Sequence, residues 1–173
     1  MRTAIISKAF ILRPYRKGDE NSLQQNISNK EIYKRTIEIP YPYTLKHAAS
    51  WIKRCTAMQR KKRKTEINFA IDKGGMAVGG IGIKNIIGHQ GEIGYWLGKR
   101  YWGKGIMTEA LELVTAYGFD KLKLKRITAC VFPSNRASAH VLEKADYKYE
   151  GTVKKGCSKD GRCMDKLMFS KVK

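Results

Sequence analysis

A glycine-rich segment between an expected strand and an expected helix has the composition of a phosphate-binding loop. Residues 98–108 read Gly-Lys-Arg-Tyr-Trp-Gly-Lys-Gly-Ile-Met-Thr. The first amides of a helix lack internal partners and the helix dipole makes that end electropositive, so a helix start attracts anions. Gly103 and Gly105 let an anion approach the main chain, and Arg100 and Lys104 add formal charge. The segment therefore predicts a site for a phosphorylated ligand.

Two common nucleotide-binding patterns do not fit this loop. A Walker A loop has the form G-x-x-x-x-G-K-[ST]. Gly98, Gly103 and Lys104 match it, but Gly105 stands where a magnesium-binding hydroxyl is required. A dinucleotide-binding fingerprint has the form G-x-G-x-x-G or G-x-G-x-x-A, and Thr108 occupies its third position. The loop therefore calls for a different phosphate-bearing ligand.

The same loop resembles the cofactor signature of a known enzyme family. Arg100-x-x-Gly103-x-Gly105 is similar to the [QR]-x-x-G-x-[GA] signature of the GNAT N-acetyltransferases. The resemblance continues through residues 91–97, 106–111, 135–138, 141–144 and 149–151. Within the family, the chain looks nearest to the RimJ/RimL-like branch, which acetylates the N-termini of ribosomal proteins. The resemblance covers nearly all of the chain in element order and is most specific over 91–151.

The resemblance implies a set of residues that would hold acetyl-coenzyme A. The loop would hold the diphosphate, and Trp96 and Leu97 in the strand before it would offer main-chain groups to the pantetheine arm. Asn135 and Ser138 would contact the arm near its sulfur, although Asn135 is equally suited to cap a helix at 136–145. Lys144 is either a further contact or a solvated residue. The implied set is Tyr95, Trp96, Leu97, Arg100, Trp102, Gly103, Lys104, Gly105, Ile106, Asn135, Ser138 and Lys144, and no metal ligands are expected.

Acetyl transfer to an amine needs an unprotonated amine, a stabilised oxyanion and, optionally, a proton for the leaving thiolate. By resemblance, the main-chain N–H of Leu97 would polarise the acetyl carbonyl. Glu92 begins the same strand and is the candidate base, directly or through water, with an exposed edge charge as the alternative. Many relatives have a tyrosine acid where this chain has Leu142, so Ser138 is the candidate acid. Direct transfer is expected rather than a covalent intermediate on Cys157.

Hydrophobic periodicity indicates the elements that position these residues. Strands are expected at 8–13, 66–71, 76–86, 92–97, 126–132, 147–153 and 163–171, and helices after Asp19 and at 45–62, 106–120 and 136–145. Asp19 and Thr44 are the expected N-caps of the first two helices. The strand–helix–strand unit over 92–132 requires a parallel pair, and the hairpin before it requires antiparallel neighbours.

The expected fold is therefore α/β (α+β), as one GNAT-like domain over residues 1–173. Its mixed, mostly antiparallel sheet would have helices on both faces. From the resemblance, the central parallel pair of strands would be splayed apart. Acceptor specificity is expected on residues 31–45 and 154–163, where Glu38, Tyr41 and Tyr43 could receive a cationic amine.

The chain is strongly basic, with 35 Lys and Arg against 15 Asp and Glu and a net charge of +20. Such a charge favours contact with polyanions such as nucleic acid or the ribosome and disfavours a polycationic small acceptor. Residues 60–64 are five consecutive cations. The charge alone does not separate a polyanion-binding surface from an ordinary solvated face.

The expected function is an N-acetyltransferase that moves an acetyl group from acetyl-coenzyme A to a primary amine, with a protein N-terminus as the preferred acceptor. A small-molecule amine acetyltransferase and a basic nucleic-acid or ribosome-binding module without turnover stay open as alternatives. Neither an export signal nor a membrane-spanning run is recognised, so the expected location is the cytoplasm, with free thiols at the four cysteines. A monomer and a homodimer are both compatible with the sequence.

Overall fold

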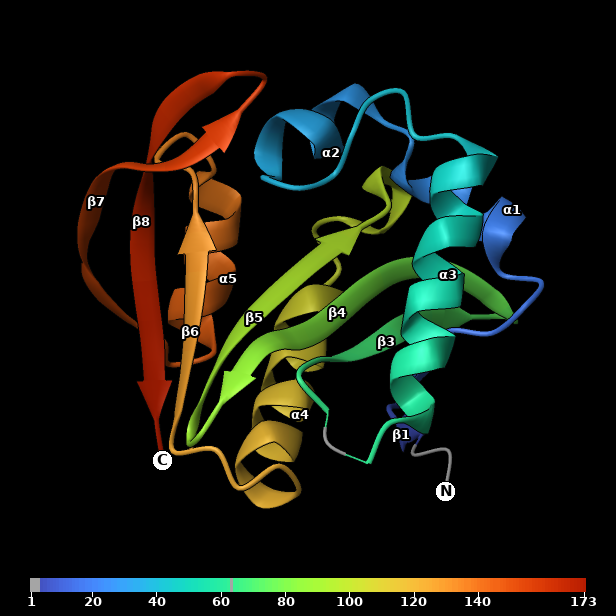
Figure 1. Cartoon of the computed structure of the whole chain (residues 1–173), viewed down its shortest axis with the longest axis horizontal. Helices are drawn as coiled ribbons and strands as arrows, with labels where there is room; N and C mark the ends of the chain where they lie inside the picture. The colour runs from blue at the N-terminus through green and yellow to red at the C-terminus, as the bar shows by residue number, and fades with distance from the viewer. Residues whose placement is uncertain (1–3, 63) are drawn as a thin grey trace.

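The computed structural model describes residues 4–62 and 64–173, whose strands form one sheet in the order β1-β2-β3-β4-β5-β6-β8-β7 (Figure 1). The strands are β1 (Ile5–Ile6), β2 (Ile11–Pro14), β3 (Ile67–Lys73), β4 (Met76–Ile87), β5 (Gln90–Leu97), β6 (Arg126–Val131), β7 (Lys148–Lys159) and β8 (Arg162–Val172). The helices are α1 (Glu20–Ile27), α2 (Lys30–Arg35), α3 (Leu45–Arg60), α4 (Ile106–Asp120) and α5 (Arg136–Lys144), with a short 3₁₀ turn, η1 (Lys99–Tyr101).

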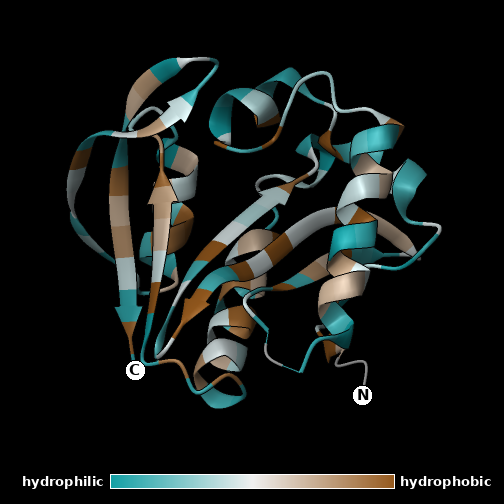
Figure 2. Ribbon diagram, viewed as in Figure 1, coloured by the Kyte–Doolittle hydropathy of each residue, from teal (hydrophilic) through white to brown (hydrophobic). Residues whose placement is uncertain are grey.

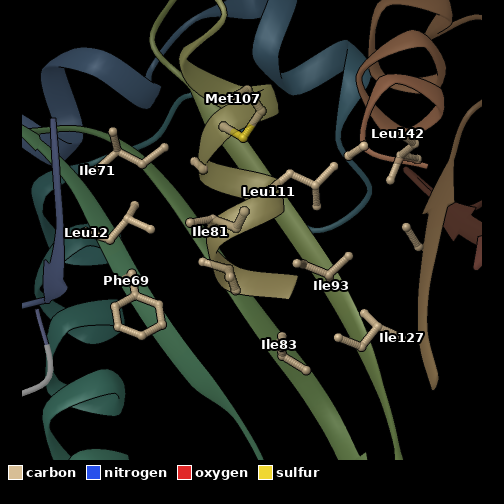
Figure 3. Packing of buried hydrophobic residues seen from close by; sticks show 14 of the residues in the cluster. Leu12, Phe69, Ile71, Ile81, Ile83, Ile93, Met107, Leu111, Ile127 and Leu142 are labelled. Atoms are coloured by element: carbon tan, nitrogen blue, oxygen red, sulfur yellow. The ribbon is translucent and has the colours of Figure 1, made fainter. Parts of the chain in front are cut away.

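Helices cover both faces of the sheet, as the sequence predicts (Figure 1). On one face, α4 packs against the central strands, and Figure 3 shows Met107 and Leu111 above Ile81, Ile83 and Ile93. On the other face, α1 and α3 enclose a second apolar cluster that includes Tyr15, Leu23, Ile27, Ile52 and Ala70. The apolar colour accordingly runs along the central strands in Figure 2. The sheet thus separates two cores, and a site that passes through it can reach both faces.

The parallel pair is splayed apart, which confirms the expected fold class. Strands β5 and β6 pair only through Gln90↔Arg126, Gly91↔Ile127 and Glu92↔Thr128. Beyond these pairs, β5 continues to Leu97 and β6 to Val131 without a ladder between them, and the two strands diverge in Figure 1. All other neighbours in the sheet are antiparallel. The separation leaves main-chain groups on the facing strand edges free for a ligand.

The two predicted helix caps have different outcomes. Thr44 caps α3 as expected, because its hydroxyl accepts the His47 amide while the His47 ring accepts the Thr44 amide. Asp19 stands at the N-cap position of α1, but its side chain makes no capping bond. Its carboxylate instead accepts two 2.8 Å hydrogen bonds from Arg13. The cap at Asp19 was therefore wrong because a buried ion pair takes the oxygens that a cap would use.

Three features lie outside the expected elements, namely β1, α2 and the outer half of the β7–β8 hairpin. Helix α2 has six residues, too few to show a helical period, and Asn29 caps it by accepting the Glu31 amide at 2.8 Å. Strand β7 runs to Lys159, six residues beyond its expected end. Its register shifts between Val153 and Cys157, so the side chains there do not alternate in a readable way. Within the described residues, no helix is long and apolar enough to span a membrane.

Candidate active site

The glycine loop leaves the first amides of α4 without protein partners. Gly105 takes the N-cap position in the left-handed conformation, with φ of 73°, and no side chain caps the helix. Among the described residues, the amides of 103–108 donate to no protein acceptor. A Cβ built on Gly103 or Gly105 would meet no atom within 4 Å, so the space in front of these amides is open. This is the arrangement that binds phosphate at a helix N-terminus.

The side chains of the loop differ in what they contact. The Trp102 indole donates a 2.7 Å hydrogen bond to the Leu97 carbonyl and so closes the loop onto the end of β5. The Arg35 guanidinium lies 5.4 Å from the centre of the Trp102 ring. Lys104 is exposed, and its Nζ lies 5.9 Å from the Tyr101 ring. Arg100 is exposed on η1 and is not among the residues that line the adjoining cavity.

Strands β5 and β6 diverge beyond Glu92, and we call the gap between them the split. The register of β5 with β4 decides which main-chain groups of β5 face this split. The Gly98 amide donates to the Val78 carbonyl at 2.9 Å, and residues 92–97 continue that register with β4. Because main-chain groups alternate along a strand, Trp96 directs its amide and carbonyl at β4. Tyr95 and Leu97 direct theirs at the split. The Leu97 N–H is therefore placed as expected, whereas Trp96 reaches the cavity with its indole.

One cavity of about 850 Å³ joins the open amides, the split and the sheet face under α1 and α3. Of the residues implied by the sequence, Arg100 is the one outside its lining. The cavity brings together Glu92, Tyr95, Trp96, Leu97, Trp102, Gly103, Lys104, Gly105, Ile106, Asn135, Ser138 and Lys144. The sequence did not predict the part of the cavity that lies under α1 and α3, which we call the far lobe. Its wall includes Tyr15, Trp51 and Gly94. Trp51 falls within the helix expected at 45–62, and nothing in the sequence indicates that this part of the helix reaches a cavity.

A pair of hydroxyls spans the split where β5 approaches α5. The Tyr95 hydroxyl lies 2.9 Å from Ser138 Oγ and 3.2 Å from the Ser138 carbonyl oxygen. Burial raises the pKa of Tyr95 well above its ordinary value, so the phenol stays protonated at neutral pH. Ser138 is held by Asn135, whose Oδ1 accepts the Ser138 amide at 3.2 Å.

Asn135 is a helix cap with both ends of its amide occupied. Its Nδ2 donates to the Arg35 carbonyl at 3.0 Å, which ties α5 to the end of α2. The capping role that the sequence left open is therefore present. Any contact of Asn135 with a ligand has to be made in addition to these bonds.

Glu92 sits in a group of charges at the closed end of the split. Lys84 Nζ lies 3.4 Å from its carboxylate and is also hydrogen-bonded to Glu38. Burial by itself would lower the pKa of Lys84, but the two carboxylates outweigh burial and leave that pKa raised. Glu92 lies roughly 16 Å from Leu97 along the strand, given a rise of about 3.3 Å per residue. A proton released beside Leu97 therefore reaches Glu92 only through intervening water.

The two segments expected to select the acceptor meet above the cavity. Lys159 Nζ donates to the Thr36 carbonyl at 2.6 Å and lies 3.9 Å from the centre of the Tyr33 ring. Tyr33 in turn is hydrogen-bonded to Asp160. Of the three side chains proposed for a cationic amine, Glu38 and Tyr43 line the cavity, whereas Tyr41 is exposed and contacts the Tyr33 ring.

A splayed parallel pair beside uncapped helix amides is the architecture of an acyl-coenzyme A-dependent transferase. The sequence comparison agrees, because the model of the Acetyltransferase (GNAT) domain family matches residues 9–148. The chain belongs to this family of acetyl-transfer enzymes.

The chain is similar to several bacterial proteins named as N-acetyltransferases. It is 29% identical over 171 residues to the uncharacterized N-acetyltransferase p20 of Bacillus licheniformis, covering 98% of this chain and 96% of that protein. It is 31% identical over 80 residues to the ribosomal protein uS5-alanine N-acetyltransferase of Escherichia coli, covering 46% of this chain and 41% of the relative. Among solved structures, Mycobacterium smegmatis RimJ in complex with CoA-disulfide is similar, with a TM-score of 0.85, 26% identity and coverage of 99% of this chain and 86% of RimJ.

Proposed function

We propose that this acetyltransferase modifies the N-terminal amine of a protein, in the manner of ribosomal-protein acetyltransferases. The observation that carries the proposal is the continuous cavity, which connects the uncapped amides of α4 with an open lobe on the opposite face of the sheet. A peptide end can enter that lobe and meet a thioester in the split. The resemblance to the uS5-alanine acetyltransferase and to RimJ supports an N-terminal amine as the acceptor.

The residues around the split fit acetyl-coenzyme A. The amides of residues 103–108 suit its diphosphate, since they are unpaired and no Cβ at Gly103 or Gly105 obstructs them. The main-chain groups of Tyr95 suit its pantetheine arm, which can pair with a strand edge, and the Leu97 N–H suits the thioester, since the Leu97 carbonyl already accepts from Trp102. When bound, the cofactor supplies an acetyl group already activated as a thioester.

The chain's own residues then have distinct roles in direct transfer. The Leu97 N–H faces the split and is the donor for the developing oxyanion. Ser138, held by Tyr95, is the group that supplies a proton to the leaving thiolate. Glu92 takes up the amine proton through water. Direct transfer is favoured because Cys157 does not line the cavity, and burial raises the pKa of Cys130, which does.

Location and partners complete the proposal. All four cysteines are free thiols, which suits the reducing cytoplasm. The net charge of +20 suits an acceptor on or near RNA, such as a ribosomal protein.

The test is acetylation of a panel of acceptors, with products identified by mass spectrometry because the four free cysteines also react with thiol reagents. The panel contains peptides with free N-termini, the same peptides with blocked N-termini and one internal lysine, and small primary amines. We expect acetylation of the free N-termini, reduced by added salt when the peptide is acidic. Preference for small amines would instead indicate a small-molecule acetyltransferase. Salt-sensitive RNA binding without any turnover would indicate a binding module.

A further inference from the structure

Gly94 in the middle of β5 differs from every other glycine in the chain. The chain has sixteen glycines, all of them within the described residues. Eight have a positive φ, which favours glycine. Seven others would place a Cβ at 3.0 Å or less from a neighbouring atom. Gly94 has neither property, because a Cβ there would meet nothing within 4 Å. Neither its backbone conformation nor its packing requires glycine.

A glycine without such a requirement weakens a strand. It loses more conformational freedom on folding than other residues and contributes no side chain to the sheet. Glycine in a strand interior often marks a place where a ligand approaches the main chain closely. The open space above Gly94 is part of the cavity. The position therefore calls for an explanation in terms of what occupies the cavity.

Gly94 lies where the split and the far lobe meet. It follows Glu92, the last residue of β5 that pairs with β6, so its edge already borders the split. Its side of the sheet is that of Glu92 and Trp96, two residues away in each direction. Opposite it on β4 stands Gly82, over which the Asn68 side chain lies. Gly94 is thus a patch of bare main chain between the indole of Trp96 and the charges around Glu92.

We propose that Gly94 is the floor over which the acceptor's amine-bearing end lies, and that its missing side chain sets how much bulk is admitted next to that amine. The class of acceptor this favours is an amine whose adjacent carbon carries a side chain, as in the first residue of a peptide. That side chain has room in the lobe lined by Tyr15, Ile27 and Trp51. The inference rests on the proposed N-terminal acceptor and adds to it a residue that selects among acceptors.

The surroundings of Gly94 also suit a peptide. Within the described residues, the Asn68 side chain makes no hydrogen bond, so its amide is available for the first peptide carbonyl. A peptide whose first carbonyl meets Asn68 would therefore lie with its amine-bearing end over the neighbouring Gly94.

The experiment compares wild type with Gly94→Ala and Gly94→Val on two matched acceptor series. One series is peptides that differ only in a first residue of Gly, Ala, Leu or Phe, and the other is the corresponding amino-acid amides. We expect the ratio of kcat/KM for Leu-first and Phe-first acceptors to that for Gly-first acceptors to fall about tenfold or more in Gly94→Val, and less in Gly94→Ala. The control Val172→Ile adds bulk to an exposed strand position outside the cavity and should leave the ratio unchanged.

Two further readouts separate this inference from other causes. The melting temperature of Gly94→Ala should equal or exceed that of wild type, because alanine restricts the unfolded chain and fits the open space. Acetyl-coenzyme A should still raise the melting temperature of both variants. An equal loss on all acceptors, or an unchanged ratio in Gly94→Val, would overturn the inference. If wild type acetylated only the amino-acid amides and none of the peptides, the proposal of a protein acceptor would be wrong. The series of amino-acid amides would still test the role of Gly94.

Discussion

At the scale of single residues, Leu142 holds the position at which the family resemblance implies a tyrosine acid. This position has no exposed surface and belongs to the main core, so it cannot present an acid to the cavity. Ser138 lies one helical turn earlier on α5, at the cavity wall, with Tyr95 2.9 Å away. Ser138 is therefore a hydroxyl on α5 that faces the cavity, and the Tyr95 hydroxyl from β5 contacts it.

We expect Ser138→Ala to lower kcat about tenfold or more while the KM for acetyl-coenzyme A changes little, because the leaving thiolate loses a proton donor. Tyr95→Phe should lower kcat less, since Ser138 stays in place and loses only its hydrogen bond with the Tyr95 hydroxyl. Steady-state kinetics measure both effects, and Ser134→Ala on the exposed preceding loop is the control. An unchanged kcat in Ser138→Ala would show that the thiolate departs unassisted.

The contribution of Lys84 to the stability of the folded chain depends on pH. Its pKa is raised above the ordinary 10.5 in the folded chain, where Glu38 and Glu92 hold it. The stability it contributes is therefore fully present below about pH 10.5 and is lost as the pH rises through the folded-state pKa. We expect Lys84→Met to be about 1 kcal/mol less stable than wild type near neutral pH, with the difference shrinking above about pH 11.

Denaturant unfolding at several pH values measures this difference, with Lys148→Met on the exposed edge strand as the control for removing one charge. The difference in unfolding free energy between wild type and Lys84→Met should shrink at high pH. A difference that stays constant or widens would contradict the ion pairing of Lys84 with Glu38 and Glu92.

At the scale of elements, helix α2 and its C-cap residue Thr36 lie across the cavity, and we call this segment the strap. Three contacts hold this six-residue helix to parts of the chain on the other side of the split. Asn135 donates to the Arg35 carbonyl, Lys159 donates to the Thr36 carbonyl, and Asp160 accepts from Tyr33. A helix this short gains little from its own hydrogen bonds, so its position depends on these contacts.

We expect Lys159→Ala to raise the KM for the acceptor several-fold and to leave the KM for acetyl-coenzyme A nearly unchanged, because the strap lies on the acceptor side. The matched control is Lys154→Ala on the same strand, where the side chain is 82% exposed and pairs with Asp165. Equal effects of the two substitutions on the acceptor KM would mean that charge, rather than the strap, is responsible.

The elements also show how far the sequence could predict the structure. Helix α4 and the loop before it were predicted to the residue, because glycine at the helix start and an apolar stripe are local signals. The strap was missed, because its contacts join residues 100 or more positions apart. The Trp102 indole donates to the Leu97 carbonyl five residues earlier, and no residue pattern in the loop indicated that contact. Local chemistry was readable in the sequence, and long-range partners were not.

At the scale of the whole molecule, the sheet consists of two parts that meet along a short seam. Strands β1 to β5 form one part and β6 to β8 the other, and their only sheet pairing is the three residue pairs at one end of β5 and β6. Helix α4 and its uncapped N-terminus lie beside the open end (Figure 1). This plan places the uncapped amides, a strand edge and the lobe under α1 and α3 in one cavity, and the proposed transfer to a protein N-terminus depends on that continuity.

The most direct test of this plan is calorimetric titration of coenzyme A and of pantetheine, which lacks the diphosphate, into wild type, Gly105→Asp and Gly74→Asp. Aspartate tolerates the left-handed conformation at both positions, with φ of 73° and 62°, but at 105 its carboxylate would cap the open amides and repel the diphosphate. We predict that wild type and Gly74→Asp bind coenzyme A about 100-fold or more tightly than pantetheine, and that Gly105→Asp loses this advantage. Equal affinities of wild type for the two ligands, or full retention of coenzyme A affinity in Gly105→Asp, would contradict the account.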